Sequence, residues 1–230
     1  MKAILLAAGM GTRLRPLTED TPKSLIKIND EPLLERQVKF LKEIGVDEIY
    51  VITGYLAEKF EYLKEKYNIN LIYNEYYNKY NNIYSMFLAK DFLGDSYVID
   101  ADVYLTRNFL RRDIEKSSYF SGIKDTLEKE WKINYNDQNK ISNIEVVSGK
   151  NYILSGISYW SNKDANIIKN ILNSFTEKFE SKELKNLYWD DVVKENLDKL
   201  DVYIEKISSN DWYEIDNLKE LEEVKKIFKK

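Results

Sequence analysis

The stretch Leu6-Ala7-Ala8-Gly9-Met10-Gly11-Thr12-Arg13-Leu14-Arg15-Pro16-Leu17-Thr18 continues a short apolar segment, 2–6, and is soon followed by Pro22-Lys23. The apolar segment is typical of a buried strand, and Gly9 and Gly11 allow a tight turn at its end. Backbone N–H groups in such a turn can approach phosphate oxygens, while Arg13 and Lys23 can neutralise a triphosphate. The stretch therefore predicts a phosphate-binding loop.

This loop matches neither of two common phosphate-binding patterns. The third glycine of a G-x-G-x-x-G fingerprint would fall at Leu14, and the chain contains no G-x-x-x-x-G-K-[ST] sequence. The alternative to phosphate binding is an ordinary glycine turn that carries two solvated basic side chains.

The first half of the chain alternates strand patterns with amphipathic helix patterns. We expect strands at 2–6, 48–53, 71–73 and 97–99, separated by helices at about 34–45, 56–67 and 83–92. This alternation predicts an α/β fold with a Rossmann-like, mostly parallel twisted sheet and helices on both faces.

The pattern changes after about residue 115. Successive strands are expected at 119–124, 131–135, 141–147, 152–160 and 202–207, and helices at about 168–179, 189–197 and 218–228. We therefore expect one domain, 1–230. It consists of a nucleotide-binding part at about 1–115, a smaller, partly antiparallel acceptor lobe at about 116–207 and a closing helix at 217–229.

The composition restricts the chemistry. The 230 residues include no cysteine and no histidine, which excludes disulfides, thiolate zinc sites and histidine general bases. A formal charge of −4 offers no basic field to DNA or RNA. No segment approaches the roughly 18 apolar residues of a membrane span. We expect a cytoplasmic protein without nucleic-acid or membrane partners, whose chemistry uses carboxylates, Lys, Arg, hydroxyls, amides and hard cations.

The segment from Gly9-x-Gly11-x-Arg13 to Pro22-Lys23 resembles the signature of the sugar-nucleotide-type nucleotidyltransferases. Further similar segments are Asp100-Ala101-Asp102, Trp131, Leu154-Ser155-Gly156, Tyr188-Trp189-Asp190 and Tyr213-Glu214-Ile215-Asp216. Within the family, these later segments are most similar to bacterial members that use CTP and phosphocholine. The resemblance implies that CTP and phosphocholine are the substrates, with CDP-choline and pyrophosphate as products.

The resemblance also implies a nucleotide and metal site. Asp100-Ala101-Asp102 ends a predicted strand, which is the ligand side of an open α/β sheet. The resemblance assigns Mg²⁺ to Asp102 and Asp216, although a strand-end cap and a helix N-cap are the respective alternatives. Arg13 and Lys23 are the expected catalytic residues. The expected nucleotide-binding residues are Leu6, Ala7, Ala8, Gly9, Gly11, Thr12, Asn82, Ser85 and Asp100.

Asn82 and Ser85 open a predicted helix. Amides and hydroxyls near a helix start can hydrogen-bond to base edges, and members of the family recognise the base in this region. Helix capping alone is the alternative for these side chains.

An aromatic and acidic cluster concerns the acceptor. A quaternary ammonium has no hydrogen to donate, so aromatic faces bind it with about 0.5–2 kcal/mol per ring, helped by carboxylates. Core packing and an acidic first helical turn are the alternative explanation. The expected choline-binding residues are Trp131, Tyr188, Trp189, Asp190 and Asp191.

The acceptor lobe lacks a feature of the sugar-1-phosphate members. Their Glu-Lys-Pro segment, whose lysine meets the sugar phosphate, is absent because the chain's prolines are Pro16, Pro22 and Pro32. This departure disfavours hexose phosphates, and Lys124 becomes a candidate for the acceptor-phosphate contact. The acceptor phosphate is largely dianionic at pH 7, so no general base is required.

Two alternatives stay open. One is the same transfer to another acceptor, either an aminoalkyl phosphate or a sugar-1-phosphate. The other is a catalytically silent regulatory domain that only binds nucleotide, which the presence of Gly11, Arg13, Lys23 and Asp102 disfavours. For the enzyme, the resemblance implies a downstream phosphocholine transferase and a supply of activated choline for cell-surface glycan or teichoic acid.

Overall fold

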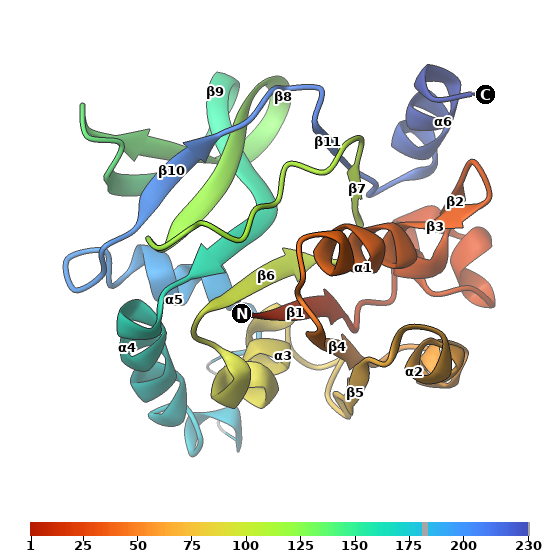
Figure 1. The fold of residues 1–230 in the computed structure, drawn as a ribbon, viewed down its shortest axis with the longest axis horizontal. Coiled ribbons are helices and arrows are strands. Elements are labelled where there is room, and N and C mark those ends of the chain that lie inside the picture. The colour runs from red at the N-terminus through yellow and green to blue at the C-terminus, as the bar shows by residue number, and fades with distance from the viewer. Residues whose placement is uncertain (181–183, 230) are drawn as a thin grey trace.

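The computed structural model describes residues 1–180 and 184–229, so residues 181–183 of the predicted acceptor lobe and Lys230 lie outside the described residues (Figure 1). A seven-stranded sheet has the order β10-β8-β9-β6-β1-β4-β5. Its parallel part contains β1 (Lys2–Ala7), β4 (Glu48–Thr53), β5 (Asn70–Tyr73) and β6 (Ser96–Asp100). The predicted α/β class is confirmed.

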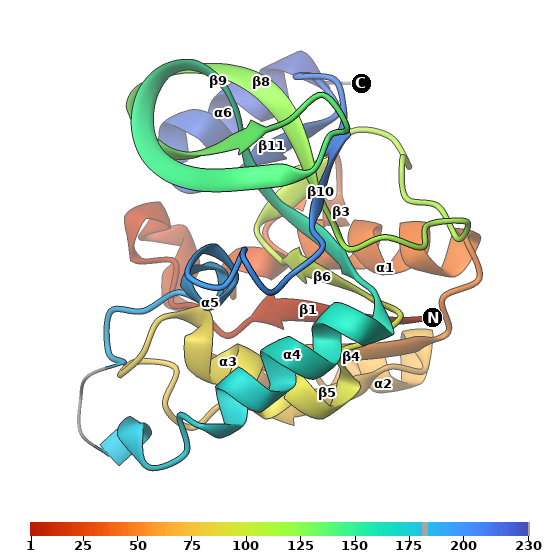
Figure 2. The same ribbon diagram turned by 90° about the vertical axis from the view of Figure 1, so that its left-hand side faces the viewer.

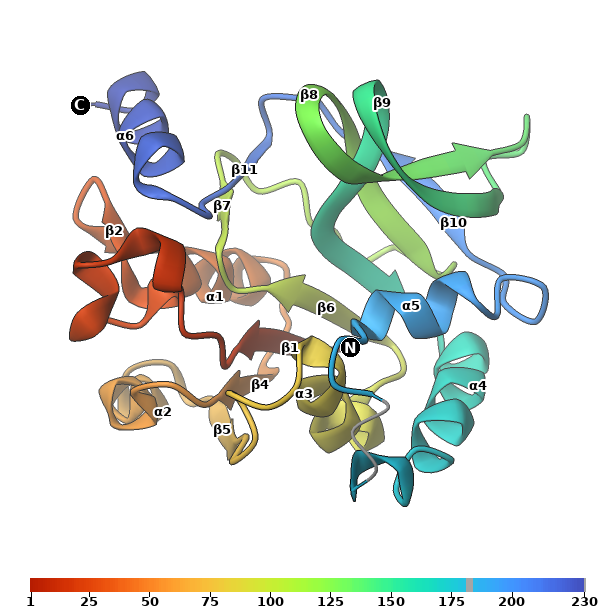
Figure 3. The same cartoon turned by 180° about the vertical axis from the view of Figure 1, so that it is seen from behind.

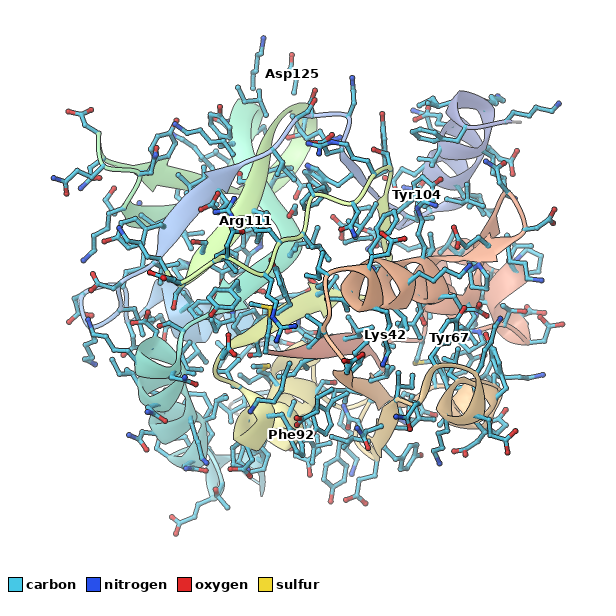
Figure 4. The ribbon with its side chains drawn as sticks, viewed as in Figure 1. Lys42, Tyr67, Phe92, Tyr104, Arg111 and Asp125 are labelled. Atoms are coloured by element: carbon cyan, nitrogen blue, oxygen red, sulfur yellow. The ribbon has the colours of Figure 1, made fainter. Side chains whose placement is uncertain are left out.

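Helices cover both faces of this sheet because side chains of β1 alternate between them. Ala3 and Leu5 pack in one core with α1 (Leu33–Glu43) and α2 (Tyr62–Tyr67), and Tyr67 at the end of α2 donates a hydrogen bond to Glu35 of α1 (Figure 4). Ile4 lies in the opposite core with α3 (Asn82–Ala89), α4 (Asn162–Asn173) and α5 (Trp189–Lys194), as Figure 3 shows from behind.

The second half differs from the prediction of four separate short strands between residues 119 and 160. Two long antiparallel strands, β8 (Ser118–Tyr135) and β9 (Ile141–Trp160), form one curved hairpin that arches over the sheet (Figure 2). Shifts in the pairing register, such as the one between Thr126 and Glu130, are irregularities of the kind that bend a ladder without ending it. Polar residues that interrupt the apolar alternation are therefore retained within the strands. The breaks that were predicted between 124 and 131 and between 147 and 152 were wrong.

The remaining elements complete the fold around this hairpin. β10 (Tyr203–Lys206) runs parallel to β8, β11 (Trp212–Glu214) pairs with β7 (Val103–Leu105), and α6 (Leu218–Ile227) closes the described chain. The helix predicted over 56–67 is divided into the 3-10 turn η4 (Ala57–Phe60) and α2. Smaller elements are η1 (Thr12–Leu14), η2 (Leu17–Glu19), η3 (Lys23–Leu25), β2 (Lys27–Ile28), β3 (Glu31–Pro32), η5 (Lys90–Phe92) and η6 (Lys178–Glu180).

Within residues 1–180 and 184–229, no helix has the length and apolar character needed to cross a membrane.

Candidate active site

A cleft of about 800 Å³ opens at the carboxyl ends of β1 and β6. Its walls come from the loop after β1, the start of α3, the hairpin β8–β9, the start of α5 and the segment that follows β11. With the exceptions of Lys124 and Asp191, every site residue predicted from the sequence lines this cleft. Segments from both ends of the chain therefore meet at the ligand side of the sheet.

The predicted catalytic lysine, Lys23, lies against the backbone of the loop that follows β1. Gly11 has the left-handed φ of 58°, and a Cβ atom placed there would lie 2.9 Å from Cβ of Lys23. The hydroxyl of Thr18 donates a 2.8 Å hydrogen bond to the carbonyl of Gly11. Any residue larger than glycine at position 11 would therefore displace Lys23 or strain the loop.

Lys23 connects the two acidic segments of the cleft. Its Nζ donates to Asp102 Oδ2 at 2.6 Å and to Asp216 Oδ1 at 2.5 Å, and Arg13 lies 2.8 Å from the same Asp216 oxygen. Burial alone would lower the pKa of Lys23, but the two carboxylates raise it above its usual range. Partial burial alone would raise the pKa of Asp216, but Lys23 and Arg13 hold this pKa below its ordinary value. Lys23 and Asp216 therefore stay charged.

Three carboxylates form a group that can hold a metal ion. Oxygens of Asp102, Glu214 and Asp216 lie within 4.8 Å of one another. Oδ1 of Asp102 is buried and has no hydrogen-bond partner within the described part of the chain. Desolvation by the surrounding protein, followed by the charges of Asp102 and Asp216, raises the pKa of Glu214 to about 8. An oxygen-rich site with an unsatisfied buried carboxylate oxygen fits a hard divalent cation.

Glu214 was not predicted from the sequence. The signal was available, because Glu214 and Asp216 are two positions apart at the end of a strand, where side chains with this spacing face the same side. The same spacing relates Asp100 to Asp102. Burial, followed by the charge of Asp102, raises the pKa of Asp100 well above its ordinary value.

Gln37 of α1 supports the turn that carries Asp102. This fully buried side chain donates hydrogen bonds from its amide nitrogen to the carbonyls of Asp100, at 3.0 Å, and Val103, at 2.8 Å. The two acceptors bracket Asp102, so α1 fixes the backbone on both sides of this carboxylate. The sequence offered no signal for this contact, because a buried glutamine on an amphipathic helix is not predicted from periodicity.

The start of α3 has partners within the protein. Ser85 accepts a hydrogen bond from the side chain of Asn74 at 2.9 Å, and Asn82 Oδ1 accepts one from the backbone N–H of Trp189 at 2.9 Å. Asn82 therefore links α3 to α5, in addition to lining the cleft. Asn74, which also lines the cleft, was not predicted.

Two aromatic side chains that line the cleft, Trp131 and Tyr188, form what we call the aromatic corner. The rings of Trp131, on β8, and Tyr188, before α5, meet edge to face with centroids 6.2 Å apart, and Tyr188 is 45% exposed. Trp189 lines the cleft but is only 3% exposed, because its ring packs against the core residue Trp160. Lys194 lies 5.3 Å from the ring of Trp131.

The two acidic residues in the first turn of α5 differ in position. Asp190 lines the cleft, and its Oδ1 accepts a 2.7 Å hydrogen bond from Tyr119. Asp191 does not line the cleft; its Oδ2 accepts from the backbone N–H of Tyr188 at 2.9 Å and thus caps α5. The alternative of an acidic first helical turn explains Asp191 because the unpaired N–H groups there attract a carboxylate.

Two lysines of β8, Lys124 and Lys129, also differ in position. Lys124 donates to the carbonyls of Ser209, at 2.6 Å, and Trp212, at 3.1 Å, and does not line the cleft. The expectation that Lys124 meets the acceptor phosphate was therefore wrong. Lys129, which lies two residues before Trp131 on β8, does line the cleft.

Residues 2–229 match the family described as Nucleotidyl transferase. The chain belongs to the nucleotidyl transferase family. Among similar proteins, this nucleotidyl transferase is 47% identical over 229 residues to a choline-phosphate cytidylyltransferase of Streptococcus pneumoniae, covering 100% of this chain and 99% of the relative. It is 45% identical to a choline-phosphate cytidylyltransferase of Haemophilus influenzae, with coverages of 95% and 93%.

Two further comparisons bear on the acceptor and on the fold. A 2-aminoethylphosphonate cytidylyltransferase of Lancefieldella rimae is 34% identical, with 95% of this nucleotidyl transferase and 89% of the relative covered. The solved structure of the CTP:phosphocholine cytidylyltransferase of Streptococcus pneumoniae superposes with a TM-score of 0.95 at 47% identity, covering 99% of each chain. The fold and the enzyme class predicted from the sequence are thus confirmed.

Proposed function

We propose that this enzyme transfers the cytidylyl group of CTP to phosphocholine and releases pyrophosphate. The observation that carries the proposal is the aromatic corner of Trp131 and Tyr188 in the same cleft as the Lys23–Asp102–Asp216 group. Two choline-phosphate cytidylyltransferases at 47% and 45% identity over nearly their whole lengths support this choice of substrates.

The nucleotide end neutralises and orients the triphosphate. The backbone around Gly9 and Gly11 cradles the phosphates, and Arg13 and Lys23 stabilise the negative charge that develops on the departing pyrophosphate. Asp102, Glu214 and Asp216 would hold Mg²⁺. When bound, the ion supplies positive charge next to the phosphate oxygens and orients them.

The reaction requires little covalent help from the protein. A phosphate oxygen of phosphocholine attacks the α-phosphorus of CTP, and the bond from that phosphorus to the pyrophosphate oxygen breaks. Because the acceptor phosphate is already largely dianionic near pH 7, no side chain needs to remove a proton. Positioning and charge neutralisation are therefore the main contributions of the residues in this cleft.

The acceptor end binds the cation of phosphocholine. Trp131 and Tyr188 offer two ring surfaces at nearly right angles, and Asp190 adds a carboxylate. Lys129 is our candidate for the contact with the acceptor phosphate, because it lines the cleft two residues before Trp131 on the same strand. Asp191 contributes through the helix cap, and Trp189 through packing beneath the corner.

The nucleotide end and the acceptor end of the cleft belong to one domain. This domain has a nucleotide-binding part at about 1–115, an acceptor lobe at about 116–207 and a closing helix at 217–229. Consumption of CTP suits a cytoplasmic enzyme. A downstream phosphocholine transferase would use the product to decorate cell-surface glycan or teichoic acid.

A pyrophosphate-release assay tests this proposal. CTP, UTP, ATP and GTP are each combined with phosphocholine, phosphoethanolamine, 2-aminoethylphosphonate and glucose-1-phosphate in the presence of Mg²⁺. We expect the highest kcat/KM for CTP with phosphocholine. A preference for glucose-1-phosphate would overturn the acceptor assignment, and a preference for another triphosphate would overturn the base assignment.

A further inference from the structure

Tyr119 is a buried aromatic residue whose side-chain hydroxyl reaches a cleft carboxylate. The side chain is 2% exposed, and its ring packs edge to face on Trp160, with centroids 5.6 Å apart, and tilted against Trp189 at 6.4 Å. Its hydroxyl donates a 2.7 Å hydrogen bond to Oδ1 of Asp190. Because the two tryptophans hold the ring, the direction of this donor is fixed.

The helix that carries Asp190 is equally constrained. Asp190 lies in the first turn of α5, whose backbone is attached to α3 by the hydrogen bond from Trp189 N–H to Asn82. Tyr188 is fixed by the capping contact with Asp191. Asp190 and Tyr188 therefore lie at the start of one helix that is attached to α3, and Tyr119 contacts this helix from β8.

We propose that Tyr119 is a positioning residue for acceptor recognition, whose hydroxyl holds the Asp190 carboxylate in place, and in its charged form, for the quaternary ammonium. This inference rests on the proposed function, because it requires an acceptor with a cationic end. It assigns a role in specificity to a residue that was not predicted from the sequence.

The physical reason is that Asp190 lies in a costly environment for a charge. Burial raises the pKa of Asp190 to about 7, the nearby charge of Asp191 adds to this effect, and the hydrogen bond from Tyr119 opposes it. Asp190 in turn helps to raise the pKa of Asp100 on β6, and Lys194 on α5 pairs with the neighbouring Asp191 at 4.0 Å. Removing the hydroxyl takes away a donor that favours the ionised carboxylate.

The test compares two acceptors that differ in charge alone. Phosphocholine and its neutral analogue, dimethylbutyl phosphate with both methyl groups on carbon 3, have the same shape, but the analogue has a carbon in place of the ammonium nitrogen. In Tyr119→Phe we expect the phosphocholine KM to rise about tenfold with little effect on kcat, since a hydrogen bond to a charged group is lost. The KM for the neutral analogue should stay within about twofold.

A matched control is available on the neighbouring strand. Tyr159 of β9 is also buried and donates a 2.9 Å hydrogen bond to an aspartate, Asp95, but does not line the cleft. Tyr159→Phe should leave both KM values unchanged. In a double-mutant cycle, Tyr119→Phe should have little further effect once Asp190→Asn has removed the charge.

The outcomes separate the two proposals. If the wild-type enzyme does not use phosphocholine, the proposed function and this inference both fail. If the wild type uses phosphocholine but Tyr119→Phe leaves its KM unchanged, the inference alone is overturned. An equal loss with both acceptors would also overturn it, because it would show a merely structural role.

Discussion

The ammonium of Lys23 lies 2.5 Å from the carboxylate of Asp216, although 193 positions of the chain separate the two residues. This ion pair joins the loop that follows the first strand to the segment that follows the last one. Asp102 is bound by the same ammonium at 2.6 Å. The charges required by a triphosphate are therefore assembled only when the whole chain has folded.

The carboxylates of Asp102, Glu214 and Asp216 predict that turnover depends on a divalent cation. We expect Asp102→Asn nearly to abolish turnover, because it removes a charged oxygen ligand and alters the buried Oδ1, which has no hydrogen-bond partner among residues 1–180 and 184–229. Asp216→Asn should be similar or milder. Steady-state turnover and Mn²⁺ binding followed by electron paramagnetic resonance check this.

Asp201→Asn is a suitable control for those variants, because Asp201 pairs with Lys140 at 2.5 Å and with Lys163 at 2.8 Å and does not line the cleft. Its turnover should equal that of the wild type. Turnover of Asp102→Asn within a few-fold of wild type would show that Asp102 is not a metal ligand.

The basic residues of the cleft predict a loss of triphosphate use. Lys23→Ala and Arg13→Ala should each lower kcat/KM for CTP by at least roughly 10²-fold, the scale of losing one charge-stabilising group. Arg15→Ala, two positions from Arg13 and outside the cleft lining, is the matched control. Full activity in either cleft variant, or the same loss in Arg15→Ala, would contradict the phosphate role.

The aromatic corner predicts a loss confined to the acceptor. Trp131→Ala should raise the phosphocholine KM about tenfold, as expected for about 1–2 kcal/mol of lost ring contact, while the CTP KM barely changes. Tyr135→Ala, on the same strand but outside the cleft lining, serves as control. An unchanged phosphocholine KM in Trp131→Ala would rule out the ring as a cation contact.

The half-buried carboxylate of Asp190 predicts a pH dependence of acceptor binding. Its pKa is raised to about 7, so it is ionised above this pH and increasingly neutral below it. The phosphocholine KM should therefore rise as the pH falls through about 7. The neutral dimethylbutyl phosphate, measured in parallel, corrects for titration of the acceptor phosphate itself. A constant ratio between the KM values for the two acceptors from pH 6 to 8 would contradict the prediction.

The support that Gln37 gives to the Asp102 turn predicts an indirect effect on metal binding. Gln37→Met keeps the volume but loses both hydrogen bonds, and we expect Mn²⁺ affinity to fall about tenfold, as for other residues that orient metal ligands. Ser121→Ala, which removes another buried side-chain hydrogen bond to a carbonyl, is the control. Equal Mn²⁺ affinity in Gln37→Met and wild type would show that the turn holds its position without Gln37.

Local patterns were sufficient to predict the parallel half of the sheet. The strand predicted over 48–53 agrees with β4, because β-branched residues and turn signals bound it clearly. The hairpin could not be predicted in the same way, since the polar residues around Thr126 and Gly149 are retained in strands by their partner strand. Tertiary pairing outweighed local preference there.

In the candidate site, too, residues that belong to a local motif could be predicted, and residues that act through distant contacts could not. Motif residues such as Gly11 and Lys23 could be predicted because a phosphate loop requires particular residue types. Tyr119 and Gln37 could not, because their roles depend on which distant groups their hydrogen bonds reach. Asp190 and Asp191 were both assigned to the acceptor, but of the two only Asp190 lines the cleft, while Asp191 caps α5.

A competition experiment tests the substrate assignment most directly, because relatives of this chain include cytidylyltransferases for both choline phosphate and 2-aminoethylphosphonate. The wild-type enzyme is given CTP and Mg²⁺ with equal concentrations of phosphocholine and 2-aminoethylphosphonate, and the products are resolved by phosphorus NMR. We predict that CDP-choline exceeds the phosphonate product at least about tenfold, since the aromatic corner favours a quaternary ammonium. Equal amounts of the two products, or an excess of the phosphonate product, would contradict phosphocholine as the acceptor.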